Sequence, residues 1–300
     1  MAEIRQILCP VDLSDISRHA LGHARAIATW YEAHVTVFYV FSPPTPLIPT
    51  TGMAEDLPVI PPAQPDEVAE EVRRFAGQRA RPAGTGEDVL VVDGSPVKEI
   101  LRKAETLPAD LLVMGTHGRG GFEALFLGSV TEKVLRSTRV PVLTVPPPVE
   151  RVESVVYKTI LCPLEFSDAS TRALEYALTL AGETGARLIL LHAVEMLVDA
   201  SQLAEVASFS VTEYQRHLEE DARARLTSAV PEEARTWCTP EVRVVSGKAY
   251  HVILDIAEQE HAEIIVMGVH GTGALHRRLF GSTTHHVIRH ARCPVLTLRG

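Results

Sequence analysis

Glycine and small hydroxyl residues recur at a fixed spacing. Gly115 and Gly118 are followed, after nine residues, by Gly128 and Ser129. Glycines directly after a strand allow positive φ and let backbone N–H groups approach a ligand closely. The free N–H groups and the dipole at a helix N-terminus favour an anion. If 110–115 is a strand and Gly128 opens a helix, the spacing predicts a phosphate site.

The same spacing occurs again at Gly268, Gly271, Gly281 and Ser282. It is not a Walker loop, because the nearest candidate, 246–249, lacks the first glycine and the hydroxyl residue. No G-x-G-x-x-G follows the first predicted strand either, which argues against a dinucleotide site. An alternative is that the glycines only form structural turns, which a duplication would also copy.

The second occurrence belongs to an internal repeat. Three segments recur with one constant offset: 7–17 (ILCPVDLSDIS) at 160–170 (ILCPLEFSDAS), 112–120 (LVMGTHGRG) at 265–273 (IVMGVHGTG), and 140–145 (VPVLTV) at 293–298 (CPVLTL). A single offset predicts two domains of the same fold without a net insertion. We place them at 1–147 and 154–300, with the linker at 148–153.

Short apolar runs alternate with helical patterns in each half. In the first half, strands are predicted at 4–10, 34–41, 88–92, 110–115 and 140–145, and helices from Ser14 and Asp15 to Tyr31 and at 66–80, 96–106 and 128–138. Continuously apolar strands suit a parallel sheet covered on both faces. Each half is therefore predicted to be a doubly wound α/β domain.

The halves differ most between their second and third strands. Residues 42–65 are rich in proline and predict a loop, either a solvated excursion or a lid or partner-binding arm. Residues 197–227 predict a continuous amphipathic helix. In a doubly wound sheet the ligand lies outside the carboxyl ends of the strands, here between the first and fourth. Asp12 ends the first strand and borders that crevice.

The strand ILCPVD with SD behind it, MGTHGRGG, the glycine spacing and the closing GSVTEKVLRSTRVPVLTV together resemble the universal stress protein family. The resemblance covers nearly the whole chain. It implies two five-stranded parallel sheets of order 3-2-1-4-5, of the adenine nucleotide alpha hydrolase-like kind. It also implies binding of ATP, or of AMP or ADP, with Mg²⁺ as the companion of a triphosphate.

The resemblance assigns nucleotide contacts to matching positions. Asp12 would contact the ribose or adenine side, and the main chain at Val40 would read the adenine edge. The implied site of the first half comprises Pro10, Val11, Asp12, Val40, Met114, Gly115, Gly118, Arg119, Gly128, Ser129, Val130 and Thr131. That of the second half comprises Met267, Gly268, Gly271, Gly281, Ser282, Thr283 and Thr284.

The second half departs from the first at three positions of the site. Glu165, Ala193 and Thr272 stand where Asp12, Val40 and Arg119 do. The longer carboxylate of Glu165 would intrude on the ribose. We therefore expect the first site to be occupied more readily than the second.

Other residue types with reactive side chains have simpler interpretations. His285, His286 and His290 could bind a metal, but no acidic partner accompanies them, and an exposed polar helix face is expected. His117 and His270 could act near the phosphates or bond to loop backbone. Cys9, Cys162, Cys238 and Cys293 lack paired spacing and are expected to be buried thiols.

Charge and hydropathy narrow the function classes. A net charge of −9 disfavours a dedicated nucleic-acid binder, and no apolar stretch is long enough to span a membrane, so a cytoplasmic location is expected. Three hypotheses stay open: a nucleotide-binding regulatory protein that acts through a protein partner with at most slow ATP hydrolysis, a nucleotide hydrolase or transferase with Asp12 or His117 as base, and a nucleotide-free interaction module.

The fifth strands, 140–145 and 293–298, would be sheet edges in the order 3-2-1-4-5. An apolar edge favours pairing with a like edge, and the duplication supplies one in the same chain. We expect an antiparallel internal pseudo-dimer, with Val142, Thr144, Val295 and Thr297 in or near the contact. The alternative is two separate domains that each pair with another chain; a further homodimer is also compatible with the sequence.

Overall fold

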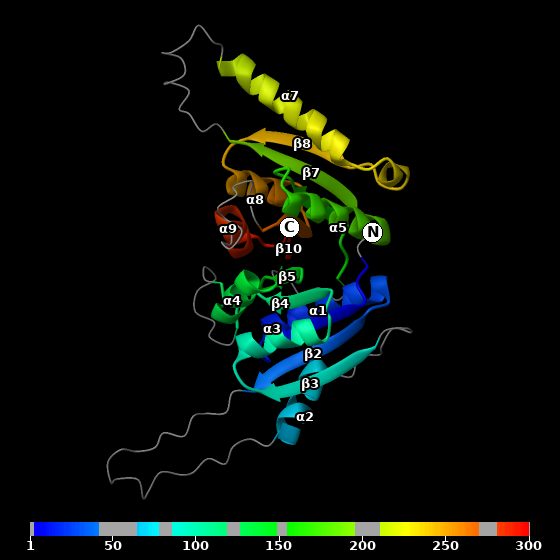
Figure 1. Ribbon diagram of the computed structural model, residues 1–300, viewed down its shortest axis with the longest axis vertical. Coiled ribbons are helices and arrows are strands. Elements are labelled where there is room, and N and C mark those ends of the chain that lie inside the picture. The colour runs from blue at the N-terminus through cyan, green and yellow to red at the C-terminus, as the bar shows by residue number, and fades with distance from the viewer. Residues whose placement is uncertain are drawn as a thin grey trace, which may run out of the picture.

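One continuous sheet runs through the protein. The computed structural model describes residues 3–41, 65–77, 86–118, 127–148, 155–195, 211–269 and 281–299. In these residues the sheet has ten strands in the order β3-β2-β1-β4-β5-β10-β9-β6-β7-β8 (Figure 1). The order 3-2-1-4-5 predicted for each half is confirmed.

The two halves contain matching elements. The first half comprises β1 (Gln6–Val11), α1 (Asp15–Tyr31), β2 (His34–Phe41), α2 (Pro65–Ala76), β3 (Glu87–Asp93), α3 (Pro96–Thr106), β4 (Leu111–Gly115), α4 (Ser129–Ser137) and β5 (Val142–Val145). The second comprises β6 (Thr159–Pro163), α5 (Asp168–Thr184), β7 (Arg187–Val194), α7 (Val211–Ala229), the short 3-10 helix Glu233–Thr236, β8 (Glu241–Ser246), α8 (Ala249–Gln259), β9 (Ile264–Gly268), α9 (Ser282–His290) and β10 (Val295–Leu298).

Helices cover both faces of the sheet. α1, α2, α5 and α7 contribute to one core cluster with alternate strand residues such as Ile7 and Cys9. α3, α4, α8 and α9 contribute to a second cluster with the intervening residues, such as Leu8. Both clusters contain residues of the two halves. The halves therefore bury continuous apolar layers rather than two separate cores.

The first helix of each half begins at a side-chain cap. The Ser14 hydroxyl oxygen accepts a hydrogen bond from the Ser17 N–H at 3.2 Å, and Ser167 does the same for Ser170 at 3.2 Å. A serine at this position satisfies an N–H group that the helix leaves unpaired. The helix start predicted at Ser14 and Asp15 is confirmed.

Several predicted boundaries shift by a few residues. Asp110 was expected in the fourth strand, but its carboxylate accepts from the N–H groups of Arg5 and Gln6 at 2.8 and 2.9 Å, and β4 begins one residue later. Pro65, expected in a loop, begins α2. The rest of the predicted loop, 42–64, and the first part of the helix predicted at 197–227, as far as 210, lie outside the described residues.

The halves meet at an antiparallel seam between β5 and β10. Thr144 pairs with Val295 and Thr297 with Val142. The Thr144 hydroxyl donates to Val295 O at 3.1 Å, and the Thr297 hydroxyl donates to Val142 O at 3.1 Å, so the two contacts are pseudo-symmetric. The predicted internal pseudo-dimer is confirmed. The linker 148–153 lies, except for Pro148, outside the described residues.

A buried polar contact ties the start of the second half to α1. The Tyr157 hydroxyl and Nδ1 of His23 are hydrogen-bonded across 2.8 Å, and Nε2 of His23 is 3.3 Å from Nε2 of His19. Trp30 packs edge-on against the Tyr157 ring. Burial lowers the pKa of His23 to about 3, and the neighbouring His19 adds to the shift. The histidine that bonds to Tyr157 at this contact is therefore neutral.

The cysteines follow the expectation at three positions of four. Cys9, Cys162 and Cys238 are buried, and burial raises the pKa of the Cys9 thiol to about 12. Cys293 was expected to be buried and is instead half-buried, because it lies in the turn that precedes β10. Among the described residues, no helix is long and apolar enough to span a membrane.

Candidate functional site

The turn after β1 holds the Asp12 carboxylate in place. Oδ1 of Asp12 accepts from both the N–H and the hydroxyl of Ser14, at 3.1 and 2.6 Å. Between them, Leu13 adopts the left-handed conformation with φ of 64°, and Phe166 repeats it in the second half with φ of 63°. This backbone is unfavourable for residues with a side chain. The turn therefore keeps a strained conformation that orients a carboxylate at the carboxyl end of the sheet.

The glycines after β4 are required by close packing. A Cβ atom on Gly115 would lie 2.7 Å from Cγ2 of Ile16, and one on Gly118 would lie 2.7 Å from Oδ2 of Asp12. A Cβ atom on Gly128 would lie 3.2 Å from the carbonyl oxygen of Thr116. None of these glycines has a positive φ, so the left-handed backbone that glycine allows is not used here. What the glycines provide is room for three chain segments to approach one another.

Helix α4 begins after a glycine, which has no side chain to cap it. Its N-cap residue is Gly128, whose own N–H donates to the Thr116 carbonyl at 2.7 Å. The Thr131 hydroxyl donates to Gly115 O at 2.8 Å and thereby ties α4 to the end of β4. The first-turn N–H groups of a helix have no partner within the helix. Those of α4 belong to Ser129 and its neighbours, which line the crevice.

The main chain at Val40 faces the same crevice. β1 pairs with β2 only as far as Val11 and Tyr39. One residue beyond Val40, the carbonyl of Phe41 accepts from the Gly94 N–H at 2.9 Å, on the β3 side. Because main-chain groups of successive strand residues point to opposite sides, Val40 directs its N–H and C=O toward the β1 side. Its N–H lies opposite Val11, the last residue of β1 in this ladder, whereas its C=O lies beyond the end of β1 and is an acceptor at the crevice.

These elements enclose a pocket of about 420 Å³ at the carboxyl end of the sheet. It is lined by all the residues predicted for the first half that the structure describes: Pro10, Val11, Asp12, Val40, Met114, Gly115, Gly118, Gly128, Ser129, Val130 and Thr131. Arg119 lies outside the described residues. The sequence interpretation did not include the other lining residues except His117, namely Ser17, Phe38, Tyr39, Pro96, Ile100 and Leu127.

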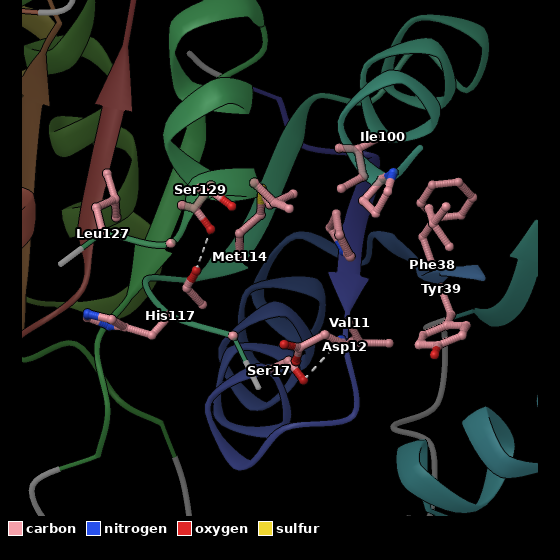
Figure 2. A pocket seen from close by; sticks show the side chains of 18 residues that line it. Val11, Asp12, Ser17, Phe38, Tyr39, Ile100, Met114, His117, Leu127 and Ser129 are labelled. Carbon is pink, nitrogen blue, oxygen red and sulfur yellow. Dashed lines mark hydrogen bonds between the residues drawn. The ribbon is translucent and has the colours of Figure 1, made fainter. Parts of the chain in front are cut away.

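The pocket has two chemically different ends. Figure 2 shows Ile100, Phe38 and Tyr39 grouped at one end, and Ser129 and His117 toward the other. Asp12 lies between them on the floor. Such a site can take an elongated ligand with a flat apolar part and an anionic part.

His117 has one unsatisfied ring nitrogen. Its Nδ1 is 2.9 Å from the Thr116 hydroxyl, whereas Nε2 is buried and has no hydrogen-bond partner in the part of the chain that is described. Burial lowers the pKa of His117. The equivalent His270 lies outside the described residues.

The second half forms a matching pocket of about 450 Å³. Its lining includes all the predicted residues of that half within the described ranges: Met267, Gly268, Gly281, Ser282, Thr283 and Thr284. Gly271 and Thr272 lie outside those ranges. As in the first half, α9 begins at an uncapped glycine, Gly281, and the Thr284 hydroxyl donates to Gly268 O at 3.1 Å.

Glu165 and Ala193 line the second pocket at the positions of Asp12 and Val40. Oε1 of Glu165 accepts from the Ser167 hydroxyl at 3.0 Å. Partial burial of the carboxyl group raises its pKa, and the hydrogen bond from Ser167 opposes that shift. The second pocket therefore carries a longer carboxylate, and this carboxyl group has a pKa above the ordinary value for glutamate.

The α9 histidines mostly contact their own helix. Nδ1 of His286 donates to Ser282 O at 2.9 Å, and Nδ1 of His290 donates to His286 O at 2.8 Å. His286 also stacks on the Tyr250 ring. Both residues are exposed, as expected for a polar helix face.

The two halves share one fold, and in each the helix at the pocket, α4 or α9, begins after a glycine. This repeated arrangement agrees with a comparison to known families. The family model of the universal stress protein family matches the chain twice, over residues 3–146 and 156–299. The chain belongs to the universal stress protein family.

Individual relatives agree with this assignment. A universal stress protein of Methanocaldococcus jannaschii is 34% identical over 145 residues, which are 48% of this chain and 83% of the relative. One of Thermus aquaticus is 34% identical over 148 residues, which are 48% of this chain and 100% of the relative. A crystal structure of a universal stress protein from Archaeoglobus fulgidus has a TM-score of 0.66 and 26% identity and covers 98% of both chains. Relatives of half the length and of the full length therefore both occur.

Proposed function

We propose that this universal stress protein binds an adenine nucleotide, ATP or its shorter forms AMP and ADP, in the first-half pocket. The observation that carries the proposal is a single pocket that joins the N-terminus of α4, which begins at a glycine, to the main-chain carbonyl of Val40. A nucleotide has the matching chemistry, with an anion at one end and a hydrogen-bonding base at the other.

The base would lie at the apolar end. Phe38, Ile100 and Met114 offer apolar walls to a flat ring, and the C=O of Val40 can accept a hydrogen bond from the exocyclic amino group of adenine. The Asp12 carboxylate, fixed by Ser14, would accept from a ribose hydroxyl. This contact disfavours a guanine base, which has a carbonyl oxygen in place of that amino group and cannot donate there.

The phosphates would lie at the α4 end. First-turn N–H groups and the helix dipole stabilise an anion, and the Ser129 hydroxyl can add a hydrogen bond. Among the described lining residues, Asp12 is the one carboxylate. A Mg²⁺ ion would therefore be held chiefly by phosphate oxygens and water, with Asp12 as the available protein ligand.

We further propose a regulatory role in the stress response, in which the nucleotide state changes the binding of a protein partner. A hydrolase or transferase would need a base placed beside the terminal phosphate. Turnover of ATP at saturating Mg²⁺ would distinguish the two: release of phosphate with many turnovers per site would favour the enzyme.

Mass spectrometry of the ligand released from denatured, purified protein tests the nucleotide directly. Calorimetric titration with ATP then tests the site in the variants Ser129→Asp and Ser282→Asp. A negative charge at the start of α4 or α9 would repel phosphates, so each variant is expected to lose binding in its own half. Ser129→Ala is the matched control and should lose only about threefold, the value of one hydrogen bond. ATP binding unchanged in Ser129→Asp, with a normal circular dichroism spectrum, would reject the site.

A further inference from the structure

The last turn of α4 is completed by the other half of the chain. Nη2 of Arg299, which follows β10, donates to the carbonyl oxygens of Leu135 at 2.9 Å and Arg136 at 2.6 Å. These carbonyls belong to the last four of the helix, which have no donor within it. Arg299 therefore provides a C-terminal cap, and its positive charge lies at the negative end of the helix dipole.

The position of Arg299 follows from the seam. Strand β10 lies in the middle of the molecule beside β5 (Figure 1). The side chain of the residue that follows β10 therefore reaches the end of α4 in the other half. Nη1 of Arg172 on α5 donates to the Arg299 carbonyl at 2.6 Å. The desolvation of Arg299, with Arg139 nearby, lowers its pKa. The second half thus fixes Arg299 from the backbone side while its guanidinium contacts the first half.

This contact has no reciprocal. The residue that stands in the first half where Arg299 stands in the second is Pro146, which has neither a side-chain donor nor a backbone N–H. Helix α9 is therefore not capped from the first half in this way. Both halves have a pocket at the same place in the fold, but only α4 is supported at its C-terminus by an arginine at this position of the other half.

We propose that Arg299 is a positioning residue through which the second half sets the anion affinity of the first pocket. Helix α4 spans Ser129–Ser137. Its first residue lines the pocket, and its last turn is bonded to Arg299. Loss of the cap would fray the last turn and remove a cation from the axis of the helix, which weakens the electrostatic attraction for a phosphate at the other end. The contact links the second half to the first pocket, and no equivalent contact from position 146 links the first half to the second pocket. The inference rests on the proposed nucleotide site.

Calorimetric titration with ATP in two backgrounds separates the pockets. In Ser282→Asp, which isolates the first pocket, Arg299→Ala is expected to weaken ATP binding about threefold to fivefold. In Ser129→Asp, which isolates the second pocket, the same change is expected to leave affinity unaltered. Arg299→Lys should restore most of the loss in the first background, since lysine can donate to the same carbonyls and keeps the charge.

The matched control is Arg292→Ala, an exposed arginine of the same half that pairs with Glu258 at 2.7 Å. It should change neither pocket. Equal weakening at both pockets, no rescue by lysine, or wild-type affinity of Arg299→Ala at the first pocket would each overturn the proposal while Ser129→Asp still abolishes that site. Absence of ATP binding in the parent chain would instead reject the nucleotide site itself and this inference with it.

Discussion

Gly118 lies so close to Asp12 that a single methyl group would test the carboxylate's role. A Cβ atom would be 2.7 Å from Oδ2, so the carboxyl group would have to shift from the position in which Ser14 holds it. We predict that Gly118→Ala lowers ATP affinity about tenfold, because loss of a charge-assisted hydrogen bond is worth ~1.5 kcal/mol. The fold should be retained. Titration calorimetry and thermal melting measure the two effects.

The control is Gly22→Ala in α1, where a Cβ atom would have no neighbour within 4 Å. It should leave ATP binding unchanged and raise stability by about 1 kcal/mol, the usual difference between alanine and glycine in a helix. If Gly118→Ala binds ATP as tightly as the parent, Asp12 does not contact the ligand.

A second residue-scale prediction concerns Glu165. Glu165→Asp restores the shorter carboxylate found at Asp12 and should raise ATP affinity at the second pocket about fivefold, or ~1 kcal/mol. Ser129→Asp is the appropriate background, since it removes the first site. No change or a loss would show that this carboxylate does not limit binding there.

Residue-level patterns predicted which glycines lie together at the pocket but not why glycine is needed there. The G-x2-G-x9-G-S spacing placed Gly115, Gly118 and Gly128 correctly, yet their role is close packing against Ile16, Asp12 and Thr116 rather than positive φ. The sequence shows that a side chain is absent at these positions, but the neighbours that fill the space beside each glycine are known only from the fold. Contacts to backbone carbonyls, such as those of Arg299, have no sequence signal because any residue supplies the acceptor.

At the scale of elements, the seam is the most direct test of how the halves are joined. Val142 is paired with Thr297 and directs its main chain toward β10, because its neighbour Pro141 accepts from Leu112 on the β4 side. Val142→Pro removes the N–H and should lower stability by about 3 kcal/mol. Small-angle scattering should show a more extended particle. A compact profile with unchanged melting would mean that the ladder is not required.

The ends of helices and strands were predicted best where residues adjacent in the sequence determine them. Pro96 begins α3 directly after Ser95, and Ser14 caps α1, so both starts agree with the sequence. β4 begins one residue late because Asp110 bonds to the distant Arg5 and Gln6 backbone, a contact that local pattern does not contain. The pairing of β5 with β10 could be predicted because the duplication provides two equivalent apolar edges.

For the whole molecule, acid should lower the stability of the fold by protonating His23, which is buried between the two halves. The folded pKa of about 3 lies below the ordinary 6.5, so the unfolded chain binds the proton more readily. The contribution is therefore full above pH 6.5 and is lost as pH falls toward 3. We predict a loss of about 2 kcal/mol in unfolding free energy between pH 7 and pH 5 from this residue. Urea denaturation across that range measures it.

The double variant His23→Leu with Tyr157→Phe provides the comparison, because it removes the buried proton acceptor without leaving the Tyr157 hydroxyl unpaired. Its stability should fall less steeply between pH 7 and pH 5. Parallel curves for the two proteins would place the acid sensitivity elsewhere.

The β5–β10 seam also changes how the pair of pockets responds to dilution. Two halves that meet as separate chains obey mass action, and they part or exchange partners when scarce. Here both edges belong to one chain, so their effective concentration is set by the connecting segment and not by the cell. The ratio of the two unlike pockets is therefore fixed at one to one in every molecule, and each half is free to diverge without losing its partner.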